Sequence, residues 1–143
     1  MKFFLLLMLL LPSTLHAQVV IGPTDAVTVF AKGARTEGTK EVAAPVTLDD
    51  ASRDISFNVD RSSYTDTSAK ILMTVEYSGD GKTWVFLCSA IALGGVLKDE
   101  KGVVLPFSSV TCTNLKATPN RQIRTSIEVL KGTANIAAEI ETK

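Results

Sequence analysis

The 143-residue chain has few of the side chains on which most enzyme sites depend. It contains one histidine, two cysteines and one tryptophan, and its 15 lysines and arginines are matched by 15 aspartates and glutamates. A formal charge of zero leaves no excess of cations for binding the phosphates of a nucleic acid. No internal repeat or low-complexity tract is visible. The length is that of a single domain.

The first seventeen residues have the three-part layout of a secretory signal peptide. Lys2 supplies a positive charge, the apolar run Phe3–Leu11 follows, and Ala17 precedes the expected cut. The run is far shorter than the roughly 20 residues of a membrane-spanning helix. We therefore expect residues 1–17 to be a cleaved signal peptide and residues 18–143 to be one secreted or periplasmic domain without a membrane anchor. The alternative is an uncleaved N-terminal anchor.

Removal of this leader would take away the only imidazole in the chain. Without His16, a Ser-His-Asp or Cys-His catalytic arrangement is excluded, and so is a histidine-based zinc or copper site. The aspartates at positions 49 to 60 match no calcium-loop spacing. Glu139 and Glu141 fit the solvent-facing side of a strand better than a glycosidase pair. We therefore expect no enzymatic activity, no cofactor and no metal.

Cys88 and Cys112 are the only cysteines, and both lie outside the leader. An even number of cysteines in an exported chain favours a disulfide. Two buried free thiols are the alternative. Neither cysteine belongs to a C-x-x-C motif, so the sequence predicts a structural bridge and not a redox centre.

Apolar and polar residues alternate along most of the chain, which is the pattern of half-buried strands. The alternation is clearest over residues 55–60, 71–77, 123–129 and 134–141. We expect an all-β domain of about eight or nine short strands, arranged as a two-sheet antiparallel β-sandwich. A β-barrel is the alternative closure.

Two finer expectations concern the order of the strands. The run from Trp84 to Leu97 is almost wholly apolar, which is typical of a central strand covered on both faces. The last two alternating segments are separated by Lys131-Gly132-Thr133, which predicts a hairpin.

The most distinctive short motif is Ser78-Gly79-Asp80-Gly81-Lys82-Thr83-Trp84. It resembles the Asp-box (BNR-type) hairpin, Ser-x-Asp-x-Gly-x-Thr-Trp, but it is one residue shorter because Asp80 and Gly81 are adjacent. The resemblance implies a structural turn in which the aspartate caps backbone N–H groups and the tryptophan packs beneath. The residues of this turn would be Ser78, Asp80, Gly81, Thr83 and Trp84. A single copy covering seven residues does not imply sialidase activity.

A wider resemblance covers the order of elements from the loop at Tyr64 to the final strand pair. This order is similar to small β-sandwich proteins of phages and mobile elements, of the fibronectin-III or jelly-roll type. The resemblance implies a structural role in an envelope or phage-related assembly.

The candidate ligand contacts are Tyr64, in a polar loop, and the two arginines Arg121 and Arg124, which would suit an acidic partner. For Trp84 we expect core packing, with a sugar-stacking platform shared with Tyr77 as the alternative. The function expected is an exported, non-catalytic binding or adhesion module, because loops on a rigid scaffold commonly carry binding sites. The alternatives are a structural subunit and a carboxylate-only hydrolase. A protein or a glycan is the candidate partner, and the sequence leaves the ligand and the oligomeric state open.

Expression with the native leader tests the first of these expectations. The exported protein should begin at Gln18, because residues 1–17 have the layout of a cleaved signal peptide. N-terminal sequencing and intact mass of the exported material measure this directly. A chain that keeps Met1 and stays inside the cells would contradict it.

Overall fold

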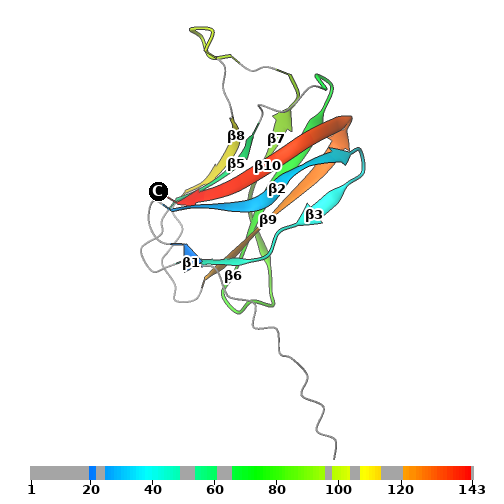
Figure 1. The fold of residues 1–143 in the computed structure, drawn as a ribbon. Helices are drawn as coiled ribbons and strands as arrows, with labels where there is room; N and C mark the ends of the chain where they lie inside the picture. Colours follow the sequence, from blue (N-terminus) through cyan, green and yellow to red (C-terminus); the bar gives the residue numbers. More distant parts are fainter. Residues whose placement is uncertain are drawn as a thin grey trace, which may run out of the picture.

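The computed structural model describes residues 20–21, 25–48, 54–60, 66–95, 98–103, 107–113 and 121–142. These ranges contain strands and turns but no helix. The strands form two sheets that pack face to face as a β-sandwich (Figure 1). The expected sandwich is confirmed, and the described strands do not join into the alternative barrel. The expected leader lies outside the described residues.

Sheet A holds six strands and sheet B holds four. The strands of sheet A are β1 (Val20–Ile21), β3 (Lys40–Val42), β4 (Val46–Leu48), β6 (Lys70–Ser78), β7 (Val85–Leu93) and β9 (Gln122–Lys131). The strands of sheet B are β2 (Ala26–Thr36), β5 (Ile55–Asp60), β8 (Phe107–Cys112) and β10 (Thr133–Thr142). Their spatial orders are β1-β4-β9-β6-β7, with β3 also against β9, and β2-β10-β5-β8. All pairs are antiparallel except β1 with β4.

The core lies between the sheets and is mainly aliphatic. Along β9 and β10 the residues alternate between buried and half-buried, so each strand turns one side inward. The register places Met73 beside Ile127 in sheet A and Phe57 beside Ile140 in sheet B. All four side chains are at most 1% exposed. Full burial of a side chain of this size contributes about 1.5–3 kcal/mol.

The last two strands lie where the sequence predicted them, but the predicted hairpin is wrong. β9 pairs with β6, β3 and β4 in sheet A, whereas β10 pairs with β2 and β5 in sheet B. The chain crosses between the sheets at Gly132, whose φ of 73° lies in the left-handed region. Because the strands belong to opposite layers, their apolar sides cover one another across the core instead of lying side by side.

Asp66 fastens this crossing to the start of β6. Its Oδ2 accepts a hydrogen bond from the backbone N of Thr133 at 2.9 Å, and its Oδ1 accepts from the hydroxyl and backbone N of Ser68 at 2.7 and 2.8 Å. These bonds, the Ser68 hydroxyl first among them, lower the pKa of Asp66. A Cβ at position 132 would collide with the same carboxylate, so the crossing requires glycine for space as well as for its φ.

β7 is the edge strand of sheet A, so the predicted central strand covered on both faces is wrong. Among the described strands it pairs with β6 alone within its sheet. Its apolar side chains are largely exposed, with Phe86 at 61% and Ile91 at 55%. A continuous apolar run is typical of a central strand, but the place of a strand in a sheet depends on long-range pairing that the run itself does not encode.

A disulfide joins the two sheets along one edge of the sandwich. Cys88 lies on β7 at the edge of sheet A, and Cys112 lies on β8 at the edge of sheet B, with their Cα atoms 5.9 Å apart. The expected bridge is therefore present, and the alternative of two free thiols is not. Because it links strands of different sheets, the bridge opposes their separation.

A forked ion pair joins the sheets along the opposite edge. Arg35 of β2 donates from Nε and Nη2 to the two carboxylate oxygens of Glu41 on β3, each at 3.0 Å. Its Nη1 also donates to the carbonyls of Gly33 at 2.8 Å and Ile136 at 3.0 Å. The Arg35 side chain is only 12% exposed. A planar guanidinium matches this set of acceptors in a way that a lysine ammonium does not.

The disulfide makes a testable contribution to stability. Replacing both cysteines by alanine should lower the free energy of unfolding by about 3 kcal/mol, because the bridge closes a loop across a sequence separation of 24 residues. Urea denaturation followed by circular dichroism measures the difference. Ser89→Ala, on the same strand, serves as the control and should leave stability unchanged within about 0.5 kcal/mol. A double variant as stable as the wild type would contradict the prediction.

Candidate binding face

The turn between β6 and β7 is built around the carboxylate of Asp80. Its Oδ1 accepts hydrogen bonds from the backbone N of Lys82 and Thr83, at 2.8 and 2.7 Å, and from the Ser78 hydroxyl at 2.9 Å. Its Oδ2 accepts from the Thr83 hydroxyl at 3.1 Å. The Ser78 oxygen accepts in turn from the backbone N of Gly81 at 2.9 Å. These bonds, led by that from the Thr83 backbone, hold the pKa of Asp80 far below its usual value.

Gly81 allows this turn to fold back over the neighbouring strand β9. Its φ of 70° is in the left-handed region. A Cβ there would lie 3.1 Å from Oε1 of Gln122, the register partner of Ser78. Ser78 itself is 1% exposed. The turn therefore fixes the position at which the chain leaves sheet A after Ser78 and re-enters it at Val85.

Arg124 connects the end of this turn to the outer face of sheet A. Its Cζ lies 4.3 Å from the centre of the Trp84 ring, and its Nε donates to Oε2 of Glu76 at 2.6 Å. Trp84 is half-buried, and it belongs neither to the buried core nor to the side chains packed against it. The expected core packing of Trp84 is therefore wrong, because the ring is held by a cation–π contact on the outer face instead.

Beside this stack the outer face of sheet A is hollowed. The hollow measures about 200 Å³ and is lined by residues of β3, β6 and β9, namely Lys40, Val42, Leu72, Thr74, Glu76, Arg124, Ser126 and Glu128. Two ion pairs lie within this lining, Arg124 with Glu76 and Lys40 with Glu128, the latter at 3.6 Å. Thr74 and Ser126 are register partners between them. The surface thus combines hydroxyls with paired charges of both signs.

Phe86 adds an exposed aromatic ring next to this surface. It is the register partner of Glu76 across β6 and β7, and it is 61% exposed. Phe86 was not among the contacts expected from the sequence, because the residue lies within the apolar run that predicted a covered strand. No signal in the local sequence distinguishes an exposed edge position in such a run from a buried central one.

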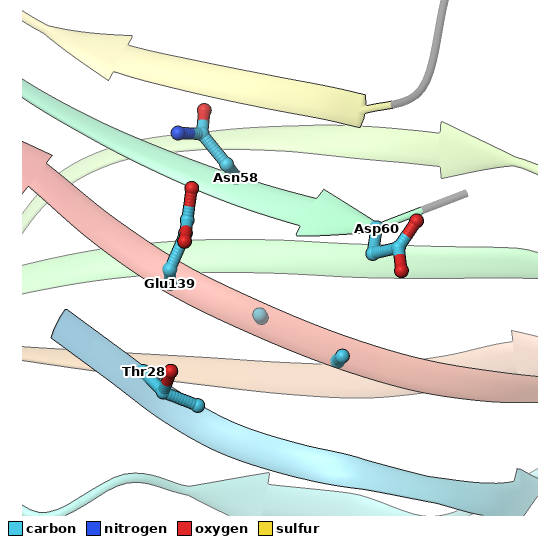
Figure 2. Close-up of a pocket in the computed structure, with 6 residues that line it drawn as sticks. Thr28, Asn58, Asp60 and Glu139 are labelled. Atoms are coloured by element: carbon cyan, nitrogen blue, oxygen red, sulfur yellow. The ribbon is translucent and has the colours of Figure 1, made fainter. Parts of the chain in front are cut away.

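A second hollow, of about 240 Å³, lies on sheet B. Figure 2 shows Thr28 from β2, Asn58 and Asp60 from β5 and Glu139 from β10 around it. The Asn58 side chain accepts from the Ser109 hydroxyl at 2.6 Å and donates to Glu141 at 3.5 Å. Polar groups on this face therefore bond largely to one another across the strands. Phe86 belongs to the other sheet, and the Trp84 ring contacts Arg124 of that sheet.

The structure separates the ligand contacts that the sequence grouped together. Tyr64 lies outside the described residues. Arg121 is 7% exposed, with its Cζ 5.8 Å from the centre of the Tyr77 ring, so Arg121 and Tyr77 stabilise the fold where they meet. Arg124, by contrast, lines the hollow. Of the predicted contacts that are described, Arg124 is the one placed on a surface suited to a ligand.

Within the described ranges, no three histidine, cysteine or acidic side chains gather as a metal site would require. The same part of the chain contains no helix long and apolar enough to cross a membrane. Neither the models of known protein families nor the curated proteins give a match to this sequence.

The lowered pKa of Asp80 gives a pH-dependent test of the turn. The ionised form is favoured in the folded state, so its contribution to stability is present above the usual pKa of 3.8 and is lost as the pH falls below it. Asp80→Asn should therefore destabilise the protein near neutral pH, and the difference from wild type should shrink below about pH 3. Urea denaturation at both pH values measures this.

Glu100→Gln is the control for this experiment, because Glu100 is an exposed acid in the loop that follows β7. It should leave stability unchanged at both pH values. A constant difference between Asp80→Asn and wild type across the pH range would contradict a role for the ionised carboxylate.

Proposed function

We propose that this domain is an exported, non-catalytic binding module that holds a glycan on the outer face of sheet A. The observation that carries the proposal is the exposed ring of Phe86 beside the Glu76–Arg124 pair of the hollow. A sugar presents C–H groups on its ring face and hydroxyls around its edge. It is therefore suited to a surface where an aromatic ring stands next to hydrogen-bonding groups that are fixed in place.

The polar groups of the hollow are already held in position before a ligand arrives. Arg124 is held by two contacts, by Glu76 through its Nε and by the Trp84 ring, whose centre lies 4.3 Å from its Cζ. Within the described residues its remaining N–H donors have no protein acceptor, so they are available to ligand oxygens. Thr74 and Ser126 add hydroxyls that both donate and accept. Fixed groups lower the ordering cost of binding.

Two features support export and a non-catalytic role. The Cys88–Cys112 bridge agrees with an oxidising compartment outside the cytosol. The charged groups of the hollow form opposite-charge pairs. Such pairs suit recognition of a neutral, hydroxyl-rich ligand better than general acid–base chemistry, which needs an acid and a base held in different protonation states.

A structural subunit of a larger envelope or phage-related assembly is the second candidate function. The observation that favours it is the exposed, uncharged edge strand β7, because an open strand edge is a template for pairing with another chain. Both functions involve β7, but the binding site uses the Phe86 side chain beside the face of sheet A, whereas assembly uses the backbone edge of the strand.

Glycan-array screening followed by calorimetry on the ligand found tests the binding proposal. Phe86→Ala should weaken affinity about twofold to tenfold, because an aromatic contact contributes about 0.5–1.5 kcal/mol. Its stability should stay close to wild type, since the ring is exposed. Thr28→Ala, on the hollow of sheet B, is the matched control and should bind like wild type. Blank arrays, or a loss of binding with Thr28→Ala but not Phe86→Ala, would overturn the proposal.

A further inference from the structure

We propose that β7 is a self-association edge, along which two copies of this chain pair antiparallel so that sheet A continues from one copy into the other. This inference does not depend on the glycan proposal, because it concerns the edge of the sheet and not the hollow on its face. The occupant of the edge is a second copy of the same chain.

The first observation is that β7 lacks the charges and proline that normally prevent edge pairing. Its nine residues, Val85–Leu93, include no charged residue and no proline. Natural edge strands usually carry charges or proline, or are very short. Two other edges follow that rule: β3 has three residues including Lys40 and Glu41, and β2 contains Lys32 and Arg35. β8, the second edge of sheet B, is also uncharged but has only six residues.

The second observation is the exposure of its apolar side chains. Val85, Phe86, Ile91 and Leu93 are 45%, 61%, 55% and 47% exposed. One irregularity in register, at the step from Val75–Cys88 to Glu76–Phe86, leaves Leu87 as an extra residue near the start of the strand. From Cys88 to Leu93 the register with β6 is regular, so this half of β7 is the natural centre for pairing with a further strand.

The third observation is that the edge is held in place. The disulfide at Cys88 ties β7 to Cys112 on β8, the adjacent edge of sheet B. Figure 1 shows β7 and β8 at the same side of the sandwich. A strand held by β6 on one side and by a covalent bridge below loses little freedom when a partner strand is added.

The size and chemistry of the edge match a two-fold contact. A nine-residue strand is about 30 Å long, and a sandwich of two layers is about 20 Å thick including side chains, so an edge-to-edge contact covers roughly 600 Å² of each copy. The total of roughly 1,200 Å² reaches the lower limit for a specific interface. A two-fold contact places the same patch against itself. A patch with no charge meets no repulsion in that arrangement, whereas a charged edge would.

Analytical ultracentrifugation of the purified, oxidised protein over a wide concentration range is the primary test. Wild type should show a concentration-dependent monomer–dimer equilibrium. Ile91→Lys should remain monomeric at concentrations where wild type is mostly dimeric, because it adds a like charge to both sides of the contact. Leu93→Lys is a second variant in case Ile91→Lys does not fold. Circular dichroism confirms folding in each case.

Val42→Lys is the matched control. Val42 is 54% exposed, almost the same as Ile91, but it lies on β3 at the other side of sheet A. It should dimerise like wild type. Hydrogen exchange should also show β7 amides that become more protected as the protein concentration rises. A wild type that is monomeric throughout overturns the proposal, even if it captures another protein at this edge. Equal loss of dimer in Val42→Lys and Ile91→Lys also overturns it.

Discussion

The packing of two apolar sheet faces against each other is the constraint on which the rest of this structure depends. Each long strand has one buried side and one wetter side, so neither sheet is stable in water without the other. This requirement explains why β9 and β10, which follow one another in the chain, belong to opposite sheets. It also explains the demand for glycine at position 132, where the crossing passes against the carboxylate of Asp66.

Two different interactions join the two sheets at opposite edges of the sandwich, a disulfide and an ion pair. One edge is closed covalently by Cys88 and Cys112, and the other by the forked pair of Arg35 and Glu41. The guanidinium also satisfies backbone carbonyls on its own sheet. An ion pair that is removed from water needs such additional bonds to offset the loss of hydration. The disulfide and the ion pair fix the relative position of the two sheets and leave the outer faces of the sheets open to solvent.

The two outer faces differ in what they offer to other molecules. On sheet B, hydroxyl and amide groups bond across the strands, as Ser56 does with Thr111 at 3.0 Å. On sheet A, the guanidinium of Arg124 is held against the Trp84 ring and lines a hollow together with the hydroxyls of Thr74 and Ser126, and the uncharged strand β7 forms the border. This asymmetry is the reason that both proposals concern sheet A, one on its face and one along its edge.

The sequence by itself predicted the all-β class, the alternating strands β5, β6, β9 and β10, and a disulfide between the two cysteines. These follow from alternation with a period of two and from an even cysteine count, both of which are local or compositional signals. The Asp80 turn was also visible, because its hydrogen bonds run between residues two or three apart. Arg124 was recognised as a candidate contact, but not its partners Glu76 and Trp84.

Only the tertiary structure decided which strands are neighbours. The alternation of apolar and polar residues in β9 and β10 would be the same whether the two strands formed a hairpin or lay in opposite sheets. The apolar run of β7 would likewise be the same in a central strand of the sheet as in an edge strand. Strand order depends on contacts between residues far apart in the chain, such as Glu76 with Arg124 or Arg35 with Ile136. The exposure of Phe86, and with it the candidate site, follows from that order, because a side chain on a strand is buried or exposed according to what lies beside and above it.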